Sequence, residues 1–149
     1  MIEALRTTGK PVCLSVATNL EESWKITPHY NVHLRRADLG KSDVEIIAKA
    51  MRAPELSLGP ALRSLSMSYN TGLTDEGAIF LTQYLPATLK ELGLVGCAIG
   101  DKGGVALLSW ASKAKGLQIM CVERNSFSKK IRQEFALLAQ EREKLQIFV

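Results

Sequence analysis

The chain has 149 residues and carries 19 Lys and Arg against 15 Asp and Glu, which gives a formal net charge of +4. No apolar stretch approaches the roughly 18 residues that a membrane-spanning helix requires, so the sequence predicts no membrane span. The densest basic runs lie near opposite ends of the repeating part of the chain, and we therefore do not expect a nucleic-acid partner.

The first 29 residues lack the pattern that organises the rest of the chain, and we expect them to form an N-terminal cap. Val12, Leu14 and Val16 alternate with smaller or polar residues, which predicts a strand. Trp24 and Ile26 predict a second short strand. A truncated repeat is the alternative for this segment.

Residues 30–149 contain a repeating apolar pattern. Blocks with apolar residues at the same relative positions begin at Leu62, Leu89 and Leu117, and a less regular block begins earlier, at Val32. Repeats of about 27 residues form one strand and one helix, which bury their apolar faces only by stacking on neighbouring units. The pattern therefore predicts an α/β solenoid of about four units.

A loop and the expected start of a helix follow each block. We expect Thr74 to cap one helix by accepting a backbone hydrogen bond, with Asp75 next to the positive end of the helix dipole. Other helices are expected to start near Ser42 and after Ser128. Residues 52–61 contain proline and glycine, and they predict a break before the next strand.

Two consecutive units carry the pattern most completely. In one, the strand is followed by Asn70 and L-T-x-x-G, and in the next by Cys97 and I-G-D-x-G. In these motifs the chain resembles the ribonuclease-inhibitor-like class of leucine-rich repeats, over residues 30–135. The resemblance implies parallel strands on a concave face and helices on a convex face. That class alternates Asn and Cys at one loop position, which implies structural roles here for Ala37, Asn70, Cys97 and Asn125.

Function in such solenoids is expected on the concave face, where equivalent residues of stacked strands form rows. The expected rows are His33, Ser66, Gly93 and Cys121; Arg35, Ser68, Val95 and Glu123; and Arg36, Tyr69, Gly96 and Arg124. The centre is small and nearly uncharged, whereas the rim carries Tyr and Arg, which are enriched at binding hot spots. We predict a partner-binding surface formed by His33, Arg35, Arg36, Ser66, Ser68, Tyr69, Val95, Cys121, Glu123 and Arg124. The alternative is an unused sheet face on which serine and glycine simply pack well.

The sequence predicts no active site, metal site or cofactor. His29 and His33 are four residues apart, but a metal site needs further ligands, and Cys13 is the only tempting one. Cys97 falls at the structural loop position. Cys121 has no histidine near it in the sequence to activate it as a nucleophile.

The function that we expect is non-catalytic binding of another protein through the concave face. The alternative is a structural subunit of a larger cytoskeletal or multiprotein assembly, with contacts through helices and termini. A third role, regulation of a small GTPase, follows from family analogy, although the long acidic tail of that group is absent here. Three cysteines near strand patterns indicate buried free thiols, and no signal peptide is recognisable, so we expect a cytoplasmic or nuclear protein.

The last five residues, 145–149, are mostly apolar. We expect them to fold back over the last repeat, because an exposed apolar tail is a liability in water. The alternatives are the cut edge of a longer chain and docking into a partner.

Overall fold

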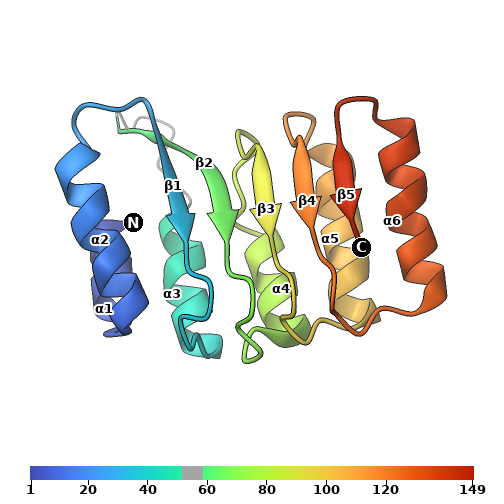
Figure 1. The fold of residues 1–149 in the computed structure, drawn as a ribbon, viewed down its shortest axis with the longest axis horizontal. Coiled ribbons are helices and arrows are strands. Elements are labelled where there is room, and N and C mark those ends of the chain that lie inside the picture. Colours follow the sequence, from blue (N-terminus) through green and yellow to red (C-terminus); the bar gives the residue numbers. More distant parts are fainter. Residues whose placement is uncertain (52–58) are drawn as a thin grey trace.

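A five-stranded parallel sheet, with helices packed on one of its faces, forms the frame of the computed structural model, which describes residues 1–51 and 59–149 (Figure 1). The strands follow one another in the sheet in sequence order. They are β1 (His29–His33), β2 (Ala61–Ser66), β3 (Glu91–Gly93), β4 (Ile119–Cys121) and β5 (Gln146–Phe148). The helices among the described residues are α1 (Ile2–Thr7), α2 (Pro11–Ser23), α3 (Lys41–Met51), α4 (Thr74–Thr82), α5 (Asp101–Lys113) and α6 (Lys129–Glu141). This architecture confirms the predicted α/β solenoid.

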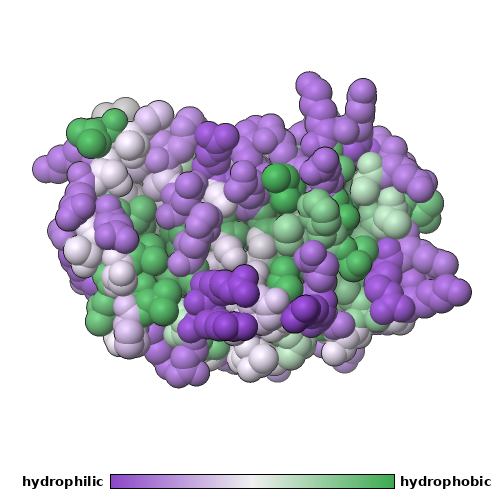
Figure 2. All heavy atoms as spheres, viewed as in Figure 1, coloured by the Kyte–Doolittle hydropathy of each residue, from purple (hydrophilic) through white to green (hydrophobic). Residues whose placement is uncertain are grey.

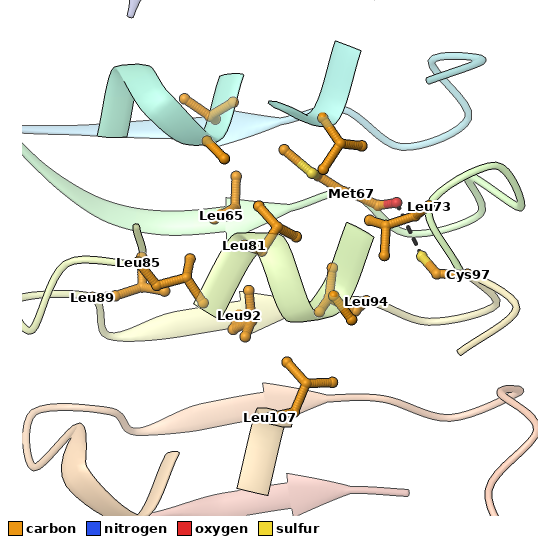
Figure 3. Packing of buried hydrophobic residues seen from close by; sticks show 14 of the residues in the cluster. Leu65, Met67, Leu73, Leu81, Leu85, Leu89, Leu92, Leu94, Cys97 and Leu107 are labelled. Carbon is orange, nitrogen blue, oxygen red and sulfur yellow. Dashed lines mark hydrogen bonds between the residues drawn. The ribbon is translucent and has the colours of Figure 1, made fainter. Parts of the chain in front are cut away.

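The core lies between the sheet and the helices, because the inward residues of each strand and one face of each helix are apolar. Parallel pairing places Leu65, Leu92 and Met120 side by side, each at most 1% exposed. Figure 3 shows Leu81 of α4 among the leucines of β2 and β3. Burial of one such side chain contributes about 1.5–3 kcal/mol. Stacked leucines therefore hold each repeat to the next.

The N-terminal segment differs from the prediction, because both expected strands are wrong. Residues 12–16 belong to α2, and residues 24–26 form a turn after it. The core side of α2 carries Cys13, Ala17 and Leu20, which are spaced as one helical face, whereas Leu14 is 41% exposed. The helices α1 and α2 pack beside α3 and β1, so this segment lies over one end of the core. Its bounds as a separate cap stay a prediction.

The predicted helix starts are met with one exception. Helix α3 begins at Lys41, next to the expected Ser42. Ser128 caps α6, and its Oγ accepts a hydrogen bond from the N–H of Ile131 at 3.3 Å. Thr74, however, is the first residue of α4, with a φ of +57° and no capping bond from its side chain. The predicted break at residues 52–61 lies mostly outside the described residues.

The C-terminal tail folds back onto the sheet as predicted. Strand β5 runs parallel to β4, and Ile147 pairs with the buried Met120. The tail thus adds a fifth strand and brings Phe148 to the open face of the sheet. Within the described residues, no helix has both the length and the apolar character needed to cross a membrane.

Candidate functional site

The open face of the sheet, opposite α3, α4 and α5, carries the first expected row in register. His33 pairs with Ser66, Ser66 with Gly93, and Gly93 with Cys121, which confirms this alignment. Phe148 pairs with Cys121 and extends the row to β5, where it is 47% exposed. The row therefore crosses all five strands, from the imidazole of His33 to the phenyl ring of Phe148.

The second and third expected rows follow the strand ends. The N–H of Arg36 donates to the carbonyl of Ser68, and the N–H of Tyr69 to that of Val95. All four members of the third row have a left-handed backbone, with φ of +51° at Arg36, +62° at Tyr69, +61° at Gly96 and +56° at Arg124. A left-handed conformation costs a non-glycine residue about 1–2 kcal/mol. Three of the four positions nevertheless keep a large side chain.

Tyr69 organises the cationic end of this face. The guanidinium carbon of Arg35 lies 4.4 Å from the centre of its ring, and that of Arg36 lies 5.0 Å away. Both distances are typical of cation–π contacts. Stacking on an aromatic face restrains an arginine side chain while leaving the edge N–H groups of its guanidinium free to donate.

The centre of the face is a shallow depression of about 310 Å³ with a floor of small polar side chains. The Nε2 atom of His33 lies 2.9 Å from the Oγ atom of Ser64. The hydroxyl of Ser66 donates to that of Ser68, whose oxygen accepts from the N–H of Val95. These contacts fix the floor without placing a bulky side chain on it.

The side of the depression toward β3 and β4 carries the Glu91 carboxylate and the Cys121 thiol. Burial, followed by the negative charges of Glu123 and Glu91, raises the pKa of the Cys121 thiol above its ordinary value. The thiol therefore stays protonated near neutral pH and is a poor nucleophile. The Oε2 atom of Glu123 is buried without a hydrogen-bond partner among the described residues.

Apolar side chains gather over the strands at the C-terminal end of the sheet. Val95, Ile119 and Cys121 are partly exposed, and Phe148 lies beyond them. Figure 2 shows this as a green area over β3 to β5, while the deepest purple gathers at the loops that follow β1 and β2. Arg35 and Arg36 therefore lie at one end of the face, while its exposed apolar side chains lie toward the other end, beside Glu91 and Arg124.

Asn70, one of the expected loop residues, is 2% exposed and joins two neighbouring loops. Its Oδ1 atom accepts from the N–H groups of Ala37 and Leu39, at 3.1 and 3.0 Å. Its Nδ2 atom donates to the carbonyls of Leu34 and Met67. The side chain thereby satisfies backbone groups that the turns leave without strand partners.

The other expected loop positions belong to the same arrangement. Asn125, two units further along the chain, makes the same kind of contacts as Asn70. Its side-chain oxygen accepts from the N–H groups of Cys97 and Ile99. The Cys97 thiol lies 3.3 Å from the carbonyl oxygen of Met67, as Figure 3 shows. Ala37 is buried and has no polar side chain, so its loop receives its bonds from Asn70.

The structure adds residues to this face that the sequence reasoning missed. Ser64, Glu91 and Ile119 pair across β2, β3 and β4 and line the depression, and Phe148 joins from β5. The signal was present, because a residue two positions before a concave residue shares its side of the strand. On β1 the exposed Asn31 pairs with Ser64 and follows the same rule, because the register shifts only before it, between Tyr30 and Asn31.

A second hollow lies on the helical side, between α5 and α6. It measures about 320 Å³ and has an apolar floor that includes Leu108, Leu137 and Leu138, with Glu134 and Glu141 at its edge. Leu137 is 55% exposed. This groove is the main competing surface for a partner.

The candidate nucleophiles and ligands are not brought together. Cys13 and Cys97 are both fully buried, and Cys121 is partly exposed. Within the described part of the chain, no three His, Cys, Asp or Glu side chains are arranged to hold a metal ion.

Comparison with known proteins gives one match. A family model for the leucine-rich repeat matches residues 60–81 and 86–108, which include β2 and α4 in one segment and β3 with part of α5 in the other. These are the two units in which the sequence pattern is most complete. No curated protein matches the chain significantly.

Proposed function

We propose that the chain is a leucine-rich-repeat protein and that it is a non-catalytic module, which holds another protein on the concave face of its sheet. Leucine-rich repeats generally mediate protein–protein interaction. The observation that carries the proposal is the depression of about 310 Å³ in this face, with a floor of small side chains and a rim that includes Arg35.

The backbone of the rim supports the same assignment. Arg36, Tyr69 and Arg124 occupy left-handed positions at which glycine would be unstrained. Strained backbone positions concentrate at functional sites, where the role of the side chain outweighs the free energy of the backbone strain. Tyrosine and arginine are also the residue types over-represented among binding hot spots.

We assign the repeats to the ribonuclease-inhibitor-like class, because Ala37, Asn70, Cys97 and Asn125 alternate at the loop position with the contacts described above. The free cysteines suit a reducing compartment, so the proposed site of action is the cytoplasm or nucleus. Neither a metal nor a cofactor enters the proposal.

Two tryptophan variants on opposite faces test the proposal. Ser66→Trp places a large side chain over Gly93 and fills the depression, whereas Ser112→Trp places the same side chain on α5, in the groove between α5 and α6. The native chain and both variants, matched for melting temperature, are used to capture partners from cell extract. A partner that is lost only with Ser66→Trp supports concave-face binding.

The second candidate function is that of a structural subunit, favoured by the apolar groove between α5 and α6. Its contacts run through helices and termini, so Ser112→Trp abolishes capture while Ser66→Trp keeps it. That result would replace the concave-face proposal. Equal capture by all three chains would contradict both functions.

A further inference from the structure

The concave face consists of two unlike halves. Over β1 and β2, and along the loops that follow them, it carries His33, Arg35 and Arg36, all exposed. Over β3 to β5 it carries the partly exposed Val95 and Ile119 and the exposed Phe148, beside Glu91 and Arg124. Figure 2 shows the two halves side by side.

The positive charge of the first half is uncompensated. Among residues 1–51 and 59–149, no carboxylate lies within ion-pair distance of Arg35 or Arg36. The ring of Tyr69 holds both guanidinium groups in place but does not neutralise them. Pre-positioned, unpaired arginines bind carboxylates through short charge-assisted hydrogen bonds with little further loss of entropy.

We propose that the occupant of this face is an acidic segment of another protein, with its carboxylates on Arg35 and Arg36 and a large apolar side chain against Val95 and Phe148. The inference rests on the proposed function and specifies its partner. The positive charge of Arg35 and Arg36 favours carboxylates at one end of the segment. The exposed apolar surface of Val95 and Phe148 favours an apolar side chain at the other end, because binding would remove that surface from water.

The geometry sets the spacing within the segment. Neighbouring strands lie about 4.8 Å apart, so β1, which precedes Arg35 and Arg36, and β4, the middle strand of the β3–β5 half, are separated by about 14 Å. An extended chain covers this distance in about four residues, at 3.3–3.6 Å per residue. An α-helix covers it in nearly three turns of 5.4 Å.

A nucleic acid fits this face less well. Glu91 and Glu123 lie in the half that a phosphate backbone would have to cross. Their carboxylates repel phosphate groups.

The test is selection from a random peptide library displayed on phage, with inserts of about twelve residues, which span the required distance in extended form. The full chain serves as bait. We expect the selected peptides to be enriched in Asp and Glu, with an apolar residue about four positions away in extended binders.

Charge reversal then locates the acidic end. Arg35→Glu is expected to weaken the selected peptides by about tenfold or more, because it replaces a charge-assisted contact with repulsion. Arg132→Glu, on the exposed side of α6, is the matched control and leaves binding unchanged. A peptide with its acidic residues replaced by Lys should recover binding to Arg35→Glu.

The outcomes separate this inference from the function on which it rests. Peptides that are blocked by Ser66→Trp but are not acidic, or do not respond to Arg35→Glu, overturn the acidic segment and leave concave-face binding intact. Failure to select any peptide, or peptides indifferent to every concave-face variant, counts against both. A mixed-sequence single-stranded oligonucleotide that competes with the peptides at physiological salt would replace the acidic segment with nucleic acid.

Discussion

Asn70 shows how a single side chain holds two repeats together. Its amide group bonds five backbone groups, two donors and three acceptors, in loops that belong to the β1 and β2 units. The side chain is almost fully buried, so water cannot replace these bonds. Each backbone group left unpaired in the interior carries a desolvation penalty.

Replacing Asn70 with alanine should therefore lower the free energy of unfolding by about 3 kcal/mol, because one unsatisfied buried group costs about 1–3 kcal/mol and relaxation recovers part of the total. Asn125→Ala should cost less, since the Asn125 side chain is only partly buried and water reaches its partners. Urea unfolding measures both values. The control is Asn19→Ala on the exposed side of α2; a cost for Asn70→Ala as small as that for Asn19→Ala would contradict the role described.

The sequence sufficed to predict which residues occupy the loop positions, because they recur at the repeat spacing. It did not predict their partners. That Asn70 serves the loop of the preceding unit depends on how the strands stack. The stacking of Arg35 and Arg36 on Tyr69 was equally out of reach, because these side chains come from different units.

Helix starts are connected from one repeat to the next. The Oδ1 atom of Asp75, at the start of α4, accepts from the N–H groups of Gly100 and Gly103, at the start of α5. Gly103 permits this approach, since a Cβ atom there would lie 2.8 Å from the same oxygen. Asp101 in turn accepts from the N–H of Ser128, which lowers the pKa of its carboxyl. An acidic side chain of one unit thus caps the helix of the following one.

Asp75→Ala should destabilise the chain by about 1–2 kcal/mol, the usual effect of losing an N-terminal cap. The loss of stability should appear as faster amide exchange in α5, whose N–H groups lose their acceptor, rather than in α4, which carries the mutation. Amide hydrogen exchange resolves the two helices. Glu76→Ala is the control, because its ion pair with Lys41 is exposed to solvent and contributes little. Faster exchange confined to α4 would show that Asp75 serves its own helix instead.

The N-terminal helices show where pattern reading fails at the level of elements. Val12, Leu14 and Val16 alternate like a strand, but the residues of α2 that reach the core include Cys13 and Ala17. In α2 the small side chains lie in the core and the larger apolar ones lie near its edge. The most hydrophobic residues of this segment therefore do not mark its buried face. The helical spacing of Cys13, Ala17 and Leu20 was present, although it was weaker than the alternation.

At the scale of the whole molecule, stacking divides the surface into two independent faces. The helices cover one side of the sheet, and the open side brings together residues from five strands that are distant in sequence (Figure 1). Arg35 and Arg36 lie at the β1 end of this face, and the exposed Phe148 lies at the β5 end. A partner whose acidic and apolar ends match the two ends of this face therefore binds in only one orientation.

Cys121 provides a built-in reporter for this face. It lines the concave depression and is partly exposed, whereas the other two cysteines of the chain are fully buried. Its pKa lies above the ordinary value, so labelling with a thiol reagent is best followed at mildly alkaline pH. Alkylation of Cys121 therefore measures whether the depression is open.

The most direct test is the rate at which N-ethylmaleimide alkylates Cys121 with and without the captured partner. Concave-face binding predicts that a partner at about ten times its Kd slows the reaction by about tenfold, because only the free fraction reacts. A partner that saturates the chain while the alkylation rate stays unchanged would place the contact elsewhere and contradict this account.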